Sequence, residues 1–131
     1  MKNNTIDPIT ILPDSTPAFR NPKECSTRIL AIRDALDILS GKWKIPIIGV
    51  LGFGKMRFKE LQREIQGITG KMLAKELRDL ELNRLVTRTV IDTKPISVEY
   101  ELSEYGHTLG KVIAELHNWG LQHRHTIMNE D

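Results

Sequence analysis

The sequence predicts a mainly helical α+β fold. Apolar residues recur every three or four positions in several segments, which is typical of amphipathic helices, and they alternate with polar residues in one late segment, which is typical of a strand. The chain has 131 residues, 40% of them hydrophobic and 27% charged, which is enough for one domain with a single core. We expect that domain over residues 23–131, after a flexible arm over residues 1–22 that contains four of the six prolines.

The first two helices are expected on either side of the Ser-Gly pair at 40–41. The first begins at Ser26 or Thr27. The second contains Pro46, and proline is well tolerated only in the first turn of a helix, so this helix either starts near Ile45 or bends there. The apolar stripe of the first helix comprises Ile29, Ile32, Ala35, Leu36 and Leu39.

The next two helices flank a short turn that contains glycine. Residues 56–65 form an amphipathic segment with charged side chains on its far side. After Gly67, the hydroxyl of Thr69 can cap a second helix, which ends near Asn83. Two consecutive amphipathic helices joined by a tight turn make a helix-turn-helix. The inward side chains of its second helix are Met72 or Leu73, then Leu77 and Leu80.

Beyond residue 84 the periodicity changes from helix to strand. Residues 85–91 are rich in β-branched side chains, and residues 97–102 alternate between apolar and polar. Residues 92–95 are turn formers with Lys94 as a basic tip, so a two-stranded β-hairpin is predicted. A helix-turn-helix followed by such a hairpin is a winged helix, and the second helix of the pair can enter the DNA major groove.

The net charge of +2 is unevenly distributed along the chain. Residues 42–94 hold twelve basic and six acidic side chains, whereas residues 95–131 hold two basic and six acidic ones. A basic middle block indicates a polyanionic partner, here double-stranded DNA, although lysines that only solvate surface helices would give the same count.

The candidate DNA-contacting residues lie on the outward face of the second helix and at the hairpin tip. A helix N-terminus binds phosphate well, and Gly70 would let the backbone approach closely. Lys71 and Lys75 are four residues apart and share one face, within reach of phosphates or guanine edges. The full set is Thr69, Gly70, Lys71, Lys75, Arg78 and Lys94.

A last helix is expected after Ser103, which can act as its N-cap. Its apolar stripe is longer than a small domain can bury, so we expect it to pack against a partner helix in a dimer. The predicted dimerisation residues are Leu109, Val112, Ile113, Leu116 and Trp119.

Residues 25 to about 119 resemble the HxlR-type winged helix-turn-helix transcriptional regulators of bacteria and archaea. Pro46 departs from the family pattern, and Gly70 and Ala74 stand at recognition-helix positions that are more often polar. The second departure implies fewer side-chain contacts to bases and an altered sequence preference. The matching motifs are GKWKIPII (41–48), RFKELQREIQGITGKMLAKELRDLE (57–81), LVTRTV (85–90) and KPISVEYELSEYGHTL (94–109).

The resemblance implies a DNA-binding and dimerisation domain over residues 23–131. It implies a homodimer held by the C-terminal helices with help from the first helix. It also implies a pseudo-palindromic DNA operator and, commonly, repression of nearby genes. Two-fold symmetry then predicts recognition helices about 34 Å apart, one turn of DNA.

Cys25 is the single cysteine, so no disulfide can form within the chain. It precedes the first predicted helix and lies near Lys23 and Arg28, and both features lower a thiol pKa and favour the reactive thiolate. A subset of the regulators that this chain resembles sense electrophiles or oxidants with a cysteine at this position. The alternative is a small buried residue at the dimer interface, or one without a role.

The sequence predicts no enzyme, cofactor or metal site. His117, His123 and His125 lack the spacing of four that helical metal sites favour, and no carboxylate pair has acid-base spacing. The longest weakly charged run is about half a membrane span, and no signal peptide is visible, so we expect a cytoplasmic protein without a membrane partner.

Two other functions fit the same pattern. One is a regulator switched by a small ligand that binds without covalent chemistry. The other is a winged helix that binds proteins and never touches DNA, which predicts an uncharged wing and recognition face. Lys71, Lys75 and Lys94 favour DNA binding over this last alternative.

Overall fold

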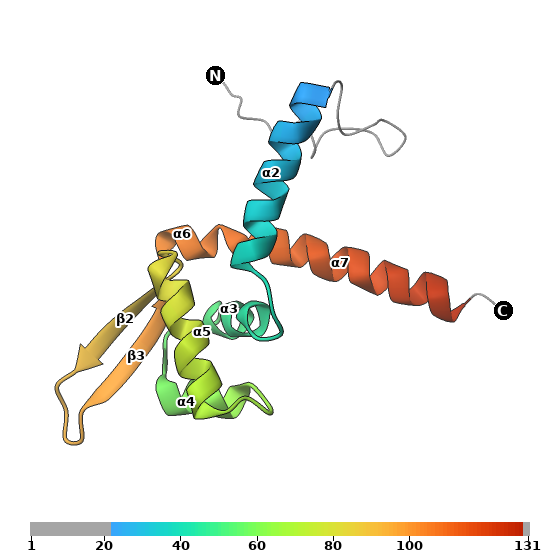
Figure 1. The fold of residues 1–131 in the computed structure, drawn as a ribbon. Coiled ribbons are helices and arrows are strands. Elements are labelled where there is room, and N and C mark those ends of the chain that lie inside the picture. Colours follow the sequence, from blue (N-terminus) through green and yellow to red (C-terminus); the bar gives the residue numbers. More distant parts are fainter. Residues whose placement is uncertain (1–21, 130–131) are drawn as a thin grey trace. The chain divides into compact units, whose positions relative to one another are not determined.

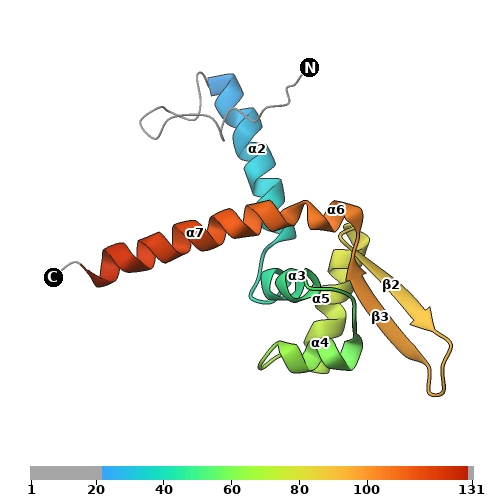
Figure 2. The same cartoon turned by 180° about the vertical axis from the view of Figure 1, so that it is seen from behind.

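The computed structural model describes residues 22–129 (Figures 1 and 2). The chain divides into two units, residues 1–38 and residues 39–131. Except for Pro22, the expected arm lies outside the described residues. The first unit contains α2 (Pro22–Ile38). The second contains α3 (Lys44–Leu51), β1 (Met56–Arg57), α4 (Phe58–Glu64), α5 (Gly70–Leu82), β2 (Val86–Ile91), β3 (Ser97–Leu102), α6 (Glu104–His107) and α7 (Leu109–Met128).

Helix α2 begins several residues earlier than the sequence predicted. Its first residue is Pro22, whose fixed φ suits the first helical position. The expectation that Cys25 precedes the helix is therefore wrong, because Cys25 lies in the first turn of α2. The helix has an exposed apolar side, which includes Ile29, Leu30, Ile32 and Leu36.

Helix α3 accommodates Pro46 by starting just before it. The helix begins at Lys44, so the proline lies in the first turn, and the Ile47 N–H donates to the Trp43 carbonyl at 3.0 Å. Of the two alternatives for this helix, a start near Ile45 is the one that the structure adopts. Gly52 follows as its C-cap.

The core of the second unit is mainly aliphatic. Its most deeply buried side chains come from α3, α4 and α5, and Val86, Tyr100 and Leu102 add to it from the sheet. Full burial of such a side chain contributes about 1.5–3 kcal/mol by removing it from water. Met72 is 38% exposed, so Leu73 is the inward residue of that pair. The most deeply buried side chains are Ile47, Leu51, Leu61, Leu73, Leu77 and Leu80.

The predicted winged helix-turn-helix is confirmed, with a third strand added to its hairpin. Strands β2 and β3 pair antiparallel from Val86 opposite Leu102 to Ile91 opposite Ser97. Strand β1 pairs with the other edge of β3, giving the order β1-β3-β2. The sequence could not reveal β1, because two residues are too few to show alternation.

The single helix expected after Ser103 is divided into α6 and α7. The Ser103 hydroxyl accepts from the Gly106 N–H at 2.9 Å, so its predicted capping role is confirmed for α6. Helix α7 follows it along the chain (Figure 2). None of the residues of α7 is buried. Within residues 22–129, no helix combines the length and apolar character needed to cross a membrane.

Helix α6 docks directly on the backbone that leads into β2. The Ser103 N–H donates to the Leu85 carbonyl at 3.0 Å, and the Ser103 hydroxyl donates to the Arg84 carbonyl at 2.6 Å. A Cβ atom placed on Gly106 would lie 2.1 Å from the Leu85 carbonyl oxygen. Only glycine allows this approach, which holds α6 against the backbone that leads into β2.

A buried lysine joins α3 to α5. The Lys44 ammonium lies 2.5 Å from Glu76 Oε1 and 3.4 Å from Asp79 Oδ2, and Lys44 is only 8% exposed. Both carboxylates project from α5 on successive turns. The three-way ion pair therefore fixes α5 against α3, beside the leucines that pack between them.

The pKa of Lys44 is raised by this arrangement. Burial alone would lower it, but the hydrogen bond and charge of Glu76, helped by Asp79, outweigh that effect. A raised folded-state pKa means that the stabilisation is complete below the ordinary lysine pKa and is lost as pH rises through the folded-state value. The ion pair is thus fully formed at neutral pH.

Replacing Gly106 with alanine should destabilise the protein strongly. The new Cβ would force α6 away from the Leu85 carbonyl, at a cost of about 3 kcal/mol or more. Urea unfolding measures this effect. Gly110→Ala is the matched control, because nothing lies within 4 Å of its added Cβ, and it should leave stability unchanged or raise it. Equal stabilities for the two variants would contradict the proposed close approach.

Lys44→Met should lower the free energy of unfolding by about 2 kcal/mol, because it leaves Glu76 partly buried without its cation. Adding Glu76→Gln should recover part of that stability. Lys75→Met removes an exposed partner of Asp79 and should cost less than about 0.5 kcal/mol. Thermal or urea unfolding at neutral pH measures all three, and the Lys44→Met deficit should shrink in strongly alkaline solution.

Candidate nucleic-acid interface

The turn between α4 and α5 is fixed by a glycine conformation, a buried side chain and a helix cap. Gly67 has φ +91°, a left-handed conformation that favours glycine, and Ile68 beyond it is buried. The Thr69 hydroxyl then accepts from the Met72 N–H at 3.1 Å, so its predicted capping role is confirmed. The turn therefore sets both the start and the direction of α5.

Helix α5 has two chemically different faces. Leu73, Leu77 and Leu80 are buried on one face. Lys71, Lys75 and Arg78 are exposed on the other. Gly70 is half-buried, with the Gln62 side chain of α4 next to it. The structure thus gathers five of the six predicted contact residues on α5 and its cap (Figure 1).

The exposed cations of α5 are not equivalent. Lys75 lies 3.7 Å from Asp79 Oδ2, the same oxygen that receives Lys44. Its side chain is nevertheless 72% exposed, so the pair is a weak surface contact. Among the described residues, Lys71 and Arg78 form no ion pair. The spacing of four residues between Lys75 and Asp79 already places them on one face of the helix, and the structure shows that their charged groups approach each other.

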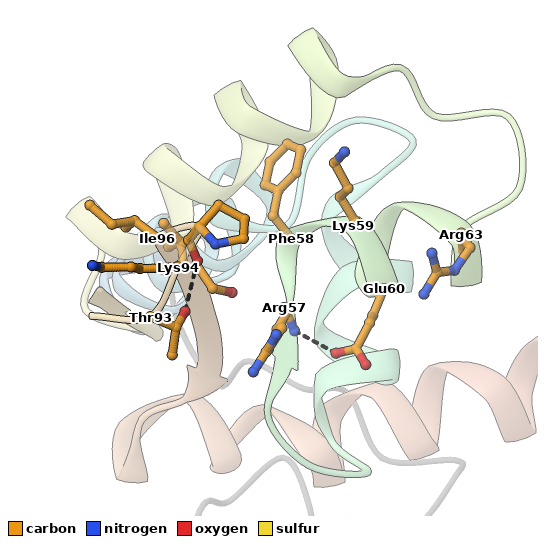
Figure 3. A pocket seen from close by; sticks show the side chains of 11 residues that line it. Arg57, Phe58, Lys59, Glu60, Arg63, Thr93, Lys94 and Ile96 are labelled. Carbon is orange, nitrogen blue, oxygen red and sulfur yellow. Dashed lines mark hydrogen bonds between the residues drawn. The ribbon is translucent and has the colours of Figure 1, made fainter. Parts of the chain in front are cut away.

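The sixth residue, Lys94, lies on the turn between β2 and β3, at one wall of a cleft of about 620 Å³. Figure 3 shows the cleft, with the hairpin turn on one side and the end of β1 and the start of α4 on the other. The residues that line it are Arg57, Phe58, Lys59, Glu60, Arg63, Thr93, Lys94, Pro95, Ile96, Ser97 and Val98.

Sequence reasoning missed the basic residues on the α4 side of this cleft. Arg57, Lys59 and Arg63 were visible only as part of the basic middle block. Their approach to Lys94 depends on β1 pairing with β3, which places Arg57 opposite Glu99. Two residues are too few to show the alternation that predicts a strand. The cleft could therefore not be found without the structure.

The other predicted site residues lie on helices outside the α4–α5 pair. Cys25 is a free, half-buried thiol in α2. On α7, Leu109 and Ile113 are half-buried, whereas Val112, Leu116 and Trp119 are exposed. The predicted dimerisation stripe therefore stands largely uncovered in the single chain.

The histidines of α7 form no metal site within residues 22–129, where no group of three ligand-type side chains is found. His123 instead stacks on Trp119, with ring centroids 5.0 Å apart and planes at 10°. His125 lies 3.1 Å from the Asn129 amide. Both contacts join residues one helical turn apart.

Comparisons with known proteins agree with this architecture. The model of the HxlR-like helix-turn-helix family matches residues 38–128. The uncharacterized HTH-type transcriptional regulator YtcD of Bacillus subtilis (strain 168) is 42% identical over 94 residues, covering 72% of this chain and 75% of YtcD.

Solved structures match over a similar span. The redox regulator HypR in its reduced form has a TM-score of 0.70 at 36% identity, covering 75% of this chain and 97% of HypR. The reduced form of the transcriptional regulator YodB from B. subtilis has a TM-score of 0.63 at 38% identity, covering 79% of this chain and 94% of YodB. Family match, identity and structure together show that this chain belongs to the HxlR-like helix-turn-helix family of transcriptional regulators.

Proposed function

We propose that this protein is a homodimeric, sequence-specific DNA-binding regulator that represses genes near its operator. The observation that carries the proposal is the exposed basic face of α5, directly opposite its buried leucines. Residues buried on one side fix which side chains the other side presents. Lys71 and Arg78 are thereby held outward on a rigid element, as reading base edges requires.

The start of α5 is suited to a phosphate. The first turn of a helix presents backbone N–H groups that have no partner within the helix. Thr69 takes the Met72 N–H, and Gly70, which adds no side chain of its own, lies next to the Gln62 side chain of α4. A phosphate here would position the helix, and Lys71, Lys75 and Arg78 would then contact the groove.

A dimer is supported by the apolar side chains left exposed on α7. Val112, Leu116 and Trp119 lie three or four residues apart on one stripe, and soluble monomers rarely expose so continuous a surface. A second copy of α7 would cover it under two-fold symmetry. Two α5 helices about one DNA turn apart would then read a pseudo-palindromic operator.

Cys25 is the proposed sensor of oxidants or electrophiles. The chain is similar to redox regulator HypR, known in reduced and oxidised forms, and to YodB, known in reduced and diamide-treated forms. In this chain the cysteine is a free, half-buried thiol in the first turn of α2. Oxidation that joins or modifies two such thiols would alter the dimer and thereby its fit to DNA.

Leu116→Glu should convert the dimer into a monomer, because it would bury a charge in the middle of the α7 stripe. Sedimentation velocity measures the change. Lys111→Glu introduces the same residue on the side of α7 away from the stripe and should leave the dimer intact. A Leu116→Glu protein that sediments like the wild type would refute this interface.

The proposed DNA binding is tested by fluorescence anisotropy with duplex DNA from upstream of the protein's own gene, in excess unrelated competitor. Reduced wild-type protein should bind with competitor resistance. Lys71→Ala should weaken that binding about tenfold, because it removes a side chain that reaches the groove. Treatment with diamide should weaken wild-type binding, and thiol should restore it.

The matched control for the thiol is Cys25→Ser, which should bind DNA like the reduced protein and ignore diamide. If Cys25→Ser still loses affinity on oxidation, the sensor is not this residue. If neither form of the wild type discriminates any duplex that spans the promoter region, the operator proposal fails and a protein-binding winged helix replaces it.

A further inference from the structure

The recognition helix alone offers few groups for holding DNA. Gly70 and Ala74 carry no polar side chain, and Lys75 is paired with Asp79. Lys71 and Arg78 remain as its cations without an ion pair in the described part of the chain. Basic groups outside α5 would therefore add substantially to the affinity for a polyanion.

The cleft between the start of α4 and the hairpin turn supplies such groups. Four of its lining residues are basic: Arg57, Lys59, Arg63 and Lys94. None of them forms an ion pair within residues 22–129. The one acidic lining residue, Glu60, accepts a hydrogen bond from the Arg57 backbone N–H at 2.9 Å. The cleft therefore carries a net positive charge that the described residues do not neutralise.

The cleft also has an apolar wall. Phe58 packs its ring at 6.4 Å from the Tyr100 ring, which ties the start of α4 to β3. Pro95, Ile96 and Val98 line the opposite side, and Ile96 is 67% exposed. Cations beside a firm apolar surface match a chain that alternates phosphates with sugar rings, since each sugar face can pack where its phosphates are held.

We propose that this cleft grips the sugar-phosphate backbone of one DNA strand, with phosphates held by Arg57, Lys59, Arg63 and Lys94. This inference rests on the proposed DNA-binding function and locates its sequence-independent part. The cleft shares Lys94 with the predicted contact set, and Figure 3 shows its cations coming from both walls. A DNA strand carries successive phosphates along its length, so it can contact cations on both walls at once.

DNA binding by this protein would then have two components, phosphate contacts in the cleft and base contacts from α5. Contacts to phosphates carry no sequence information and depend steeply on salt, while contacts to base edges discriminate sequences. Removing a cleft cation should therefore weaken operator and unrelated DNA by the same factor. Removing the Lys71 ammonium from α5 should instead reduce the ratio between the two affinities.

The test measures dissociation constants for an operator-containing duplex and an unrelated duplex, each over a series of salt concentrations. Lys59→Gln and Arg63→Gln remove one exposed cleft cation each from α4. The slope of log affinity against log salt should fall by about 0.9 for each phosphate that is no longer neutralised, and by twice that in a dimer. Lys111→Gln, on α7, removes the same charge elsewhere and should leave the slope unchanged.

Each outcome decides something different. Slopes and affinities that match those of Lys111→Gln would overturn the cleft as a DNA-binding element, even with operator binding intact. Salt-dependent binding of the unrelated duplex that falls with Lys59→Gln would support the cleft, even if no operator were found. Wild-type protein that binds neither duplex at low salt would refute both proposals. Equal unfolding temperatures across the variants exclude misfolding as the cause.

Discussion

The attachment of α5 to α3 is the constraint on which the rest of the structure depends. Leu73, Leu77 and Leu80 fix the rotation of α5 about its axis, because they must face the core. Apolar packing alone would let α5 slide along its axis. The ion pairs of the Lys44 ammonium with Glu76 and Asp79 fix the position of α5 along that axis relative to α3. The rotation of α5 and its position along the axis together determine which side chains face outward and how far they project.

The same core explains why the terminal helices are left uncovered. The most deeply buried aliphatic side chains belong to α3, α4 and α5, whereas α2 and α7 contain no buried residue. An amphipathic helix gains stability mainly by burying its apolar side, so both helices need another surface. The surfaces proposed for assembly and for DNA binding thus lie on different elements, and a change in one need not disrupt the folding of the other.

Features that depend on neighbouring residues were predictable from the sequence. Contacts between residues far apart in the chain were not. The Thr69 cap, the two long strands of the hairpin and the inward leucines of α5 follow from spacing and residue type within one segment. In the sequence, by contrast, Lys44 is indistinguishable from the other lysines of the basic block. Its ion pair could not be predicted, because its partner Glu76 lies 32 residues away. Strand β1, the cleft beside it and the division between α6 and α7 depend equally on contacts between separate segments.

A count of basic residues therefore does not measure a DNA-binding surface. Lys44 is buried and holds two helices together, so its charge is neutralised inside the protein. Lys75 is exposed but shares Asp79, which weakens its attraction for a phosphate. Lys59 and Arg63 have neither burial nor an ion-pair partner among the described residues, and their charge remains available to an external polyanion. Burial and long-range pairing, which only the folded chain reveals, distinguish a structural cation such as Lys44 from cations that stay available to a partner.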